Sequence, residues 1–114
     1  MRTAEQYISS LGELKPKIYC FGKLIGNVVE EPIVRPHINA AAMTYHLAHD
    51  PSLKELLTAT SHLTGKTINR FTHIHQDTVD LVKKVKMLRL ISRKTGSCFQ
   101  RCVGWDALNA IYTV

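Results

Sequence analysis

Two cysteine thiols, Cys98 and Cys102, are the residues of this chain whose type and spacing best fit metal chemistry. If the stretch around them is helical, residues four apart share one face with Cβ atoms about 5–6 Å apart, so two sulfurs can bind one metal centre. A mononuclear or iron–sulfur centre takes about four protein ligands, so this pair would be half a site. The alternative is that both thiols are small core hydrophobes, a common role of free cysteine.

The spacing excludes two other metal motifs. Trp105 stands where a radical-SAM-like motif needs a third cysteine, and a zinc ribbon needs cysteine pairs separated by two residues. His73 and His75 form a second candidate pair, but no matching Cys, Asp or Glu constellation accompanies them. Histidines in hydrogen-bonded loop or core positions are therefore the favoured interpretation of that pair.

A basic run precedes the cysteines and contributes much of the net charge of +6, with a pI near 9.4. Such charge suits an anionic partner, such as nucleic acid, a phosphate-bearing cofactor or coenzyme A, and does not choose among them. The alternative is a solvated helix face. The run consists of Lys83, Lys84, Lys86, Arg89, Arg93, Lys94 and Arg101.

Capping patterns and apolar spacing predict a series of helices that position these groups. Thr3 and Gln6 have the form of a capping box, and Pro16 ends the helix that follows. Ser52 is placed to cap a short helix. Leu81, Val85 and Leu88, flanked by Val82, Met87 and Ile91, predict a wide core face on a long helix. We expect helices at about 4–14, 37–49, 52–57 and 77–93, and a last helix that begins near Cys98.

The start of the last helix decides the chemistry of the thiols. Ser97 and Gln100 have capping-box form, which would place Cys98 in the first helical turn. There the helix macrodipole and nearby arginines favour the thiolate, the form that binds metal. The alternative is one helix that continues through Gly96, which keeps Cys98 and Cys102 on one face without the dipole effect.

The rest of the chain is less regular. Residues 17–21 are either a brief extended segment or a connector, residues 26–36 have the glycine and prolines of a loop, and residues 58–75 carry no clear period.

A chain of 114 residues can bury one modest core, so we expect one domain or part of one. An apolar stripe through Trp105 and Leu108 continues to the last residues without a C-cap, which predicts an incomplete protein. Three cysteines and no long apolar run predict a cytoplasmic setting without a membrane partner.

Four segments of this sequence, in order and over essentially its whole length, resemble one family. They are Thr3–Ile8, Gly65–Phe71, Lys83–Met87 and above all Ser97–Gly104. They are similar to the amino-terminal part of the 4-hydroxybutyryl-CoA dehydratases within the 4-hydroxyphenylacetate 3-hydroxylase flavoprotein family. The resemblance implies a mainly α chain, in which residues 1–114 are the amino-terminal helical domain of an acyl-CoA-dehydrogenase-like subunit. The middle β domain and the carboxy-terminal helical domain would lie outside this chain, and the full-length subunits would form a homotetramer.

The resemblance also implies the chemistry. Cys98 and Cys102 would be two ligands of a [4Fe-4S] cluster whose other ligands come from the rest of the same subunit, and FAD would be the second cofactor. The CoA-thioester substrate would be 4-hydroxybutyryl-CoA, dehydrated to crotonyl-CoA, with isomerisation of vinylacetyl-CoA. Gln100 would touch substrate or water beside the cluster, unless it only caps the helix. Phosphate groups of CoA or flavin would contact Arg89, Arg93 and Lys94, for which a solvated face or a subunit interface is the alternative.

Two further readings remain open. A flavin-dependent aromatic hydroxylase of the 4-hydroxyphenylacetate 3-monooxygenase type would keep the family but leave the paired thiols without a role. A small basic helical module would bind nucleic acid or a protein, yet the chain has no helix-turn-helix or aromatic nucleic-acid signature, so we expect no nucleic-acid partner. Under the leading interpretation the chain alone is inactive, because most of the cofactor-binding residues lie elsewhere.

Overall fold

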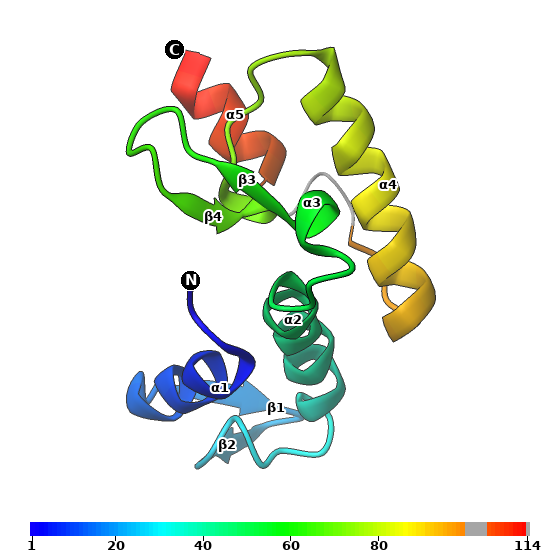
Figure 1. Ribbon diagram of the computed structural model, residues 1–114. Coiled ribbons are helices and arrows are strands. Elements are labelled where there is room, and N and C mark those ends of the chain that lie inside the picture. Colours follow the sequence, from blue (N-terminus) through cyan, green and yellow to red (C-terminus); the bar gives the residue numbers. More distant parts are fainter. Residues whose placement is uncertain (100–104, 114) are drawn as a thin grey trace. The chain divides into compact units, whose positions relative to one another are not determined.

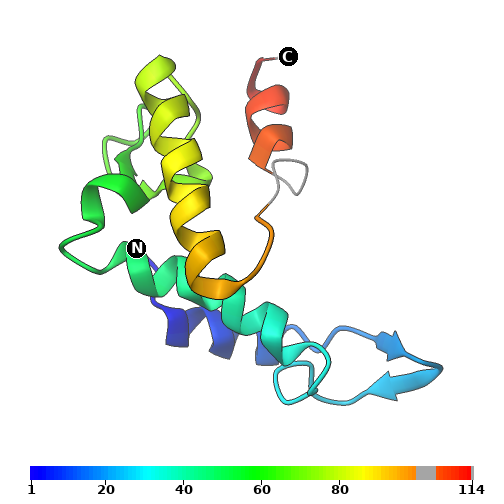
Figure 2. The same cartoon turned by 90° about the vertical axis from the view of Figure 1, so that its right-hand side faces the viewer.

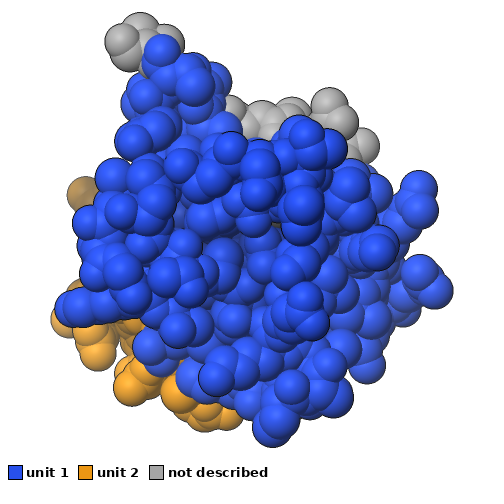
Figure 3. Space-filling view, turned by 45° about the horizontal axis from the view of Figure 1, so that its top comes forward, with its two compact units in different colours: residues 1, 47–114 blue, residues 2–46 orange. Residues whose placement is uncertain are grey.

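The computed structural model describes residues 1–99 and 105–113, and these divide into two compact units (Figure 1, Figure 3). One unit comprises residues 2–46, and the other comprises Met1 and residues 47–114. The described chain is mainly α, with two small antiparallel sheets of two strands each. None of its described helices is long and apolar enough to cross a bilayer.

The unit of residues 2–46 begins with helix α1 (Ala4–Glu13), which confirms the first predicted helix. Both hydrogen bonds of the capping box are present: the amide of Gln6 donates to Thr3 Oγ1 at 3.3 Å, and the amide of Thr3 donates to Gln6 Oε1 at 2.9 Å. These two bonds satisfy amides that would otherwise have no partner at the start of the helix.

A β-hairpin follows, formed by β1 (Ile18–Cys20) and β2 (Lys23–Ile25), with Ile18 opposite Ile25. The expected extended segment at 17–21 is therefore a strand, and its partner strand was not predicted. Phe21 and Gly22 form the turn, both at positive φ (49° and 77°), as a two-residue hairpin loop requires. The ring of Phe21 is 90% exposed.

Helix α2 (Arg35–Ala48) begins two residues before the expected start, because Pro36 occupies its first turn, where a missing amide costs nothing. In the same unit Tyr7 of α1 stacks on Tyr45 of α2, with ring centroids 4.8 Å apart. Burial, and secondarily the charge of Tyr45, raises the pKa of Tyr7. The stacked pair and buried Ile38 lie in the core of this unit.

The unit that contains residues 47–114 holds α3 (Lys54–Leu57), β3 (Thr58–Thr60), β4 (Thr67–Asn69), the 3-10 helix η1 (Arg70–Thr72), α4 (Thr78–Thr95) and α5 (Trp105–Thr113). The prediction that Ser52 caps α3 is wrong, because its amide and hydroxyl both donate to Asp50 Oδ1, at 2.8 and 2.7 Å. Leu53 is the N-cap and makes no side-chain capping bond. Strands β3 and β4 pair antiparallel within the region that had no clear period.

Helix α4 confirms the predicted long helix but only part of its predicted wide core face. Met87 and Ile91 are fully buried at 0% exposure, whereas Leu81 and Val85 are 47% and 43% exposed. The buried side of α4 thus contains two flanking residues of the predicted face, and not Leu81 or Val85. Four apolar residues of α4 form an exposed row, which we call the outer row: Val79, Leu81, Val82 and Val85.

The prediction that the last helix begins near Cys98 is also wrong, because residues 97–99 are not helical and α5 begins at Trp105. Gly96 ends α4 in the left-handed conformation at φ 65°, with its amide donating to Ser92 O at 2.9 Å. This cap also excludes a helix that continues through Gly96. Figure 2 shows α4 and α5 running in opposite directions on either side of this connection.

Candidate functional site

Cys98 lies three residues beyond Thr95, the last residue of α4, in the described part of the α4–α5 connection. Its side chain is exposed and its thiol is free of any disulfide. Within the described structure it is therefore not part of the core. Cys102, Gln100 and Arg101 lie outside the described residues, so the predicted arrangement of two thiols and a glutamine remains a prediction.

The position of Cys98 corrects the electrostatic argument for its thiolate. A helix N-terminus is positive, but Cys98 follows the C-terminus of α4, which carries the negative end of the macrodipole. The dipole therefore does not favour the thiolate here. The positive groups close in sequence are Arg93 and Lys94, which occupy the last turn of α4.

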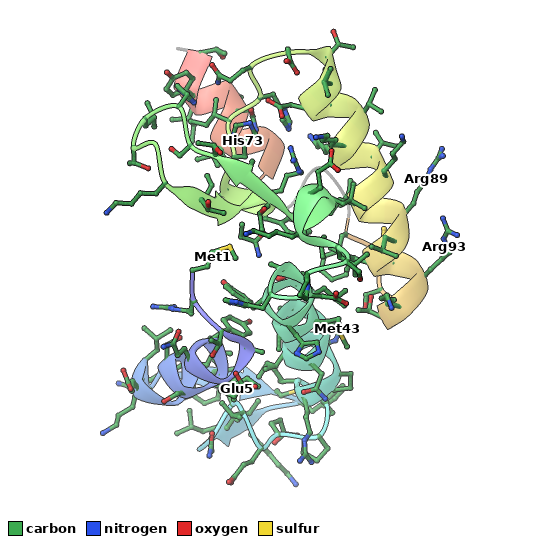
Figure 4. All side chains as sticks on the ribbon, viewed as in Figure 1. Met1, Glu5, Met43, His73, Arg89 and Arg93 are labelled. Atoms are coloured by element: carbon green, nitrogen blue, oxygen red, sulfur yellow. The ribbon has the colours of Figure 1, made fainter. Side chains whose placement is uncertain are left out.

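The three predicted phosphate-binding residues all lie on the carboxy-terminal half of α4. Arg89, Arg93 and Lys94 are exposed, and Figure 4 shows the side chains of Arg89 and Arg93 extending outward from the helix. The guanidinium Nε of Arg93 donates to Arg89 O at 3.4 Å, within the helix itself. Their placement makes a cationic, accessible surface, which is the property that an anion-binding role requires.

The Cys98 thiol is the type of ligand that an iron–sulfur cluster binds, but a cluster needs about four such ligands. An exposed, free thiol is a ligand type that iron–sulfur clusters use. Among residues 1–99 and 105–113, no group of three or more His, Cys, Asp and Glu side chains could hold a metal ion. A site that contains Cys98 must therefore take most of its ligands from outside these residues.

A groove of about 690 Å³ lies elsewhere in the same unit, between α3, the β3–β4 sheet and the start of α4. Its lining includes Lys54, Glu55, Lys83, Arg70, His73 and Asp80, but neither Cys98 nor Arg89, Arg93 or Lys94. Glu55 Oε1 accepts from Lys83 Nζ at 3.0 Å. This hydrogen bond, together with the lysine charge, lowers the pKa of Glu55.

Arg70 is the best-connected side chain at this groove, and it is only 3% exposed. Its Nε donates to Leu56 O at 2.8 Å, and its Nη2 donates to Glu55 O at 3.1 Å and Thr58 O at 2.7 Å. Its Nη1 pairs with Asp80 Oδ1 at 3.1 Å. One guanidinium thus connects the end of α3, the start of β3, η1 and the first turn of α4.

His73 completes this cluster and is 4% exposed (Figure 4). Asp80 Oδ2 accepts from His73 Nε2 at 2.8 Å and from the amide of Gln76 at 3.0 Å. Because an ionised carboxylate only accepts hydrogen bonds, Nε2 carries the hydrogen. Nδ1 is buried and has no hydrogen-bond partner in the described structure. The interpretation of His73 as a hydrogen-bonded core histidine is confirmed.

The carboxylate of Asp80 is held in its charged form by these contacts. Partial burial raises its pKa, but the Gln76 amide, the hydrogen bond and charge of His73, and the charge of Arg70 together outweigh burial. The pKa of Asp80 therefore lies below its ordinary value. Because all four guanidinium contacts are internal and Nδ1 of His73 is shielded from solvent, we interpret this cluster as an anchor of the fold.

Sequence reasoning did not find the Arg70–His73–Asp80 cluster. The three residues come from η1, the loop after it and the first turn of α4, so no helix or strand period joins them. The one local signal was the acidic start of the long helix, where Asp77 caps by accepting from the amide of Asp80 at 2.8 Å. A capping pattern does not reveal that the second carboxylate pairs with a buried arginine.

Comparison with known proteins agrees with this architecture. The chain is 58% identical, over 113 residues, to a 4-hydroxybutyryl-CoA dehydratase/vinylacetyl-CoA-Delta-isomerase from Clostridium aminobutyricum. It also superposes on an oxygen-tolerant archaeal 4-hydroxybutyryl-CoA dehydratase from N. maritimus, with a TM-score of 0.90 and 45% identity over 97% of this chain. The oxygenase component of 4-hydroxyphenylacetate 3-monooxygenase, in complex with FAD, matches 82% of this chain with a TM-score of 0.70 and 26% identity.

These matches cover a minor part of each relative. The chain spans 23% of the Clostridium aminobutyricum protein, 22% of the archaeal dehydratase and 19% of the oxygenase component. Residues 3–114 match the family described as 4-hydroxyphenylacetate 3-hydroxylase N terminal. The chain therefore belongs to the 4-hydroxyphenylacetate 3-hydroxylase family and corresponds to its amino-terminal region.

Proposed function

We propose that this chain is the amino-terminal part of a [4Fe-4S]- and FAD-dependent 4-hydroxybutyryl-CoA dehydratase that also isomerises vinylacetyl-CoA. One observation carries the proposal: Cys98 is an exposed, free thiol in a chain 58% identical to such an enzyme. Residues 1–114 would be the first helical domain of an acyl-CoA-dehydrogenase-like subunit, completed by the rest of that subunit and assembled as a cytoplasmic homotetramer.

The residues of this chain have distinct roles in the proposal. Cys98 and Cys102 bind the cluster, and Gln100 lies between them in sequence, where it contacts substrate or water. A bound cluster supplies a Lewis acid for the leaving hydroxyl, and FAD supplies reversible electron transfer. Arg89 and Arg93, with Lys94, offer exposed positive charge to the phosphates of CoA or FAD. By itself the chain is expected to catalyse no turnover, because its described residues lack a complete metal site.

The test is a chimaera in which this chain replaces the matching region of the Clostridium aminobutyricum dehydratase. Produced and reconstituted anaerobically, it is expected to bind one cluster per subunit and to dehydrate 4-hydroxybutyryl-CoA. Cys98→Ala and Cys102→Ala should each abolish cluster binding, measured as iron and acid-labile sulfide per subunit. Cys20→Ala is the matched control, because this third thiol lies in β1 of the other unit.

Full cluster content in both Cys98→Ala and Cys102→Ala would contradict the proposal. Loss of the cluster in the Cys20→Ala control as well would mean that the assay reports folding and not ligation. The unmodified chain, assayed without the remaining part of the subunit, should show no dehydration. Turnover by that chain alone would contradict its assignment as one part of a larger catalytic unit.

A flavin-dependent aromatic hydroxylase is the second candidate, favoured by the match to the oxygenase component of 4-hydroxyphenylacetate 3-monooxygenase at a TM-score of 0.70. That match has 26% identity, against 58% for the dehydratase, so the dehydratase is the better supported. The two candidates differ in whether the active enzyme contains bound iron. A second chimaera, with the rest of the oxygenase component, that hydroxylates 4-hydroxyphenylacetate with reduced flavin and O₂ and without bound iron would favour the hydroxylase.

A further inference from the structure

The hairpin of β1 and β2 has one covered face and one exposed face. Ile25 is buried at 9% exposure, and Ile18, directly opposite it, is half-buried. Tyr19 and Leu24 also lie directly opposite each other, and they are 68% and 59% exposed. Because successive side chains of a strand point to opposite faces, this second pair forms an outer, apolar face. Figure 2 shows the hairpin extending away from α1 and α2.

Phe21 lies at the tip of this hairpin in a backbone conformation that aromatic residues rarely adopt. Its φ is 49° and that of Gly22 is 77°, and a two-residue turn with two positive φ angles prefers the pair Asn-Gly. A side chain is strained at such a φ, because its Cβ atom approaches the following carbonyl oxygen. The ring of Phe21 is 90% exposed, so packing within the described chain does not offset this strain. Local folding therefore does not explain an aromatic residue at the tip.

The charge around the hairpin selects the chemistry of a partner. Residues 14–29 contain no acidic residue and three exposed lysines, Lys15, Lys17 and Lys23. An apolar face within a positive segment is complementary to an apolar pocket with carboxylates at its rim. A second copy of this chain is a poor partner, because it presents the same lysines and a net charge of +6.

The size of the exposed face indicates that the partner belongs to the same polypeptide. At their exposed fractions, the side chains of Tyr19, Phe21 and Leu24 offer about 400–500 Å², since one aromatic side chain buries about 150–250 Å². Each partner in a stable interface between separate proteins buries about 800 Å². A smaller contact is sufficient between linked parts, because linkage gives a high effective concentration. The chain spans 23% of its Clostridium aminobutyricum relative, so most of such a subunit lies outside it.

We propose that the hairpin tip, formed by Tyr19, Phe21 and Leu24, docks into an apolar pocket rimmed by carboxylates in the carboxy-terminal part of the same subunit. This inference rests on the proposed function only in that the rest of a family subunit completes this chain, and it requires neither a cluster nor a flavin. The strained turn then has a physical reason. It presents the ring of Phe21 at the tip, and burial of that ring in the pocket offsets the strain.

The experiment compares the exposure of the tip in two molecules: this chain, and the chimaera in which it replaces the matching region of the Clostridium aminobutyricum dehydratase. Hydroxyl-radical footprinting, analysed by mass spectrometry, measures the oxidation rate of each side chain. Phe21 and Tyr19 should oxidise rapidly in the chain, where they are 90% and 68% exposed, and about tenfold more slowly in the chimaera. An equal rate for Phe21 in both molecules would overturn the docking, and it would leave iron content and dehydration, which test the proposed function, unaffected.

Phe21→Asn separates docking from folding. It creates the Asn-Gly pair that the turn prefers, so the unfolding temperature of the chain should rise by about 2–5 °C. In the chimaera the same change should return Tyr19 to at least about half of its oxidation rate in the chain, because the ring that anchors the tip is lost. Phe21→Leu is the matched control, because it keeps an apolar side chain and should leave Tyr19 protected.

A lower unfolding temperature of the chain with Phe21→Asn would mean that the ring stabilises its own unit, and the proposal would fail. If Phe21→Asn does not fold in the chimaera, the oxidation rates of the unmodified chimaera decide the result. The occupant is identified by a photoreactive benzophenone analogue of phenylalanine, incorporated in place of Phe21. Cross-linking to the carboxy-terminal part of the same polypeptide is expected, whereas cross-linking between two polypeptides would overturn the assignment to the same subunit.

Discussion

Replacing Arg70 by methionine tests whether the buried guanidinium anchors the unit that carries Cys98. Methionine has a similar length and keeps apolar packing, but it donates no hydrogen bond. The change leaves three carbonyl oxygens, those of Leu56, Glu55 and Thr58, without this donor, and it leaves Asp80 without its guanidinium partner. The substitution therefore leaves acceptors of α3, β3 and α4 without that donor at the same time.

The expected loss of stability follows from burial. Breaking a buried ion pair by removing one partner costs about 3–5 kcal/mol, because the remaining charge is buried without compensation. Asp80 is partly buried, with 18% of its side chain exposed, and keeps its bond to His73, so we expect the lower end, about 3 kcal/mol. For a small domain with a free energy of unfolding of about 5–15 kcal/mol, this is a large fraction.

The assay is urea unfolding followed by fluorescence of Trp105, the single tryptophan, which belongs to the same unit. With a urea m value of about 1–3 kcal/mol/M, the midpoint of Arg70→Met should fall by about 1 M or more. Arg89→Met is the matched control, because Arg89 is exposed on α4. The same substitution there should change the free energy of unfolding by less than about 0.5 kcal/mol.

Equal midpoints for Arg70→Met and Arg89→Met would refute the reasoning, because a guanidinium with four internal hydrogen bonds would then contribute no more than an exposed one. Arg70→Lys gives a second check. An ammonium keeps the charge but cannot reproduce the planar fork that reaches three carbonyls and a carboxylate. Its stability should lie between that of the unmodified chain and that of Arg70→Met.

Two other predictions concern the same unit. The pKa of Asp80 is lower in the folded chain than in the unfolded chain, so its contribution to stability is present above a pH of about 4 and is lost as the pH falls through the folded pKa. The stability advantage over Asp80→Asn, measured by urea unfolding at several pH values, should shrink below about pH 4, and an advantage that grows there would contradict this assignment. Gly96→Ala should destabilise the chain by about 1–2 kcal/mol in thermal unfolding, because φ at that position is 65° and an L side chain is strained there. Gly12→Ala, within α1 at an open position, is the control and should cause no loss.

Local signals predicted the helices well. The capping box at Thr3 fixed the start of α1 to the residue, and the apolar and capping patterns found α4. These signals succeed because each depends on residues within one or two turns of each other. The start of α2 was misplaced because Pro36 was taken as a loop residue, although proline is well tolerated in a first helical turn.

Other features could not be predicted because residues distant in sequence decide them. The side of α4 that is buried depends on which elements cover it, so the apolar spacing predicted too wide a face, which included the exposed Leu81 and Val85. Capping-box form at Ser97 predicted a helix at Cys98. Residues 97–99 are instead part of the connection, where the ring of Phe99 contacts the ring of Phe71. The sequence does not distinguish Arg70 from the exposed cations, because its four acceptors lie in α3, β3 and α4.

The outer row of α4 has a consequence for the behaviour of the chain in solution. Its apolar side chains are 43–58% exposed on a molecule with a net charge of +6. Like-charge repulsion between molecules opposes contact between these rows, and it acts over about 8 Å at physiological ionic strength but only about 3 Å in 1 M salt. Salt therefore removes the repulsion without weakening apolar attraction. The colloidal stability of the chain falls as ionic strength rises, so dilute buffer is the condition in which it stays dispersed.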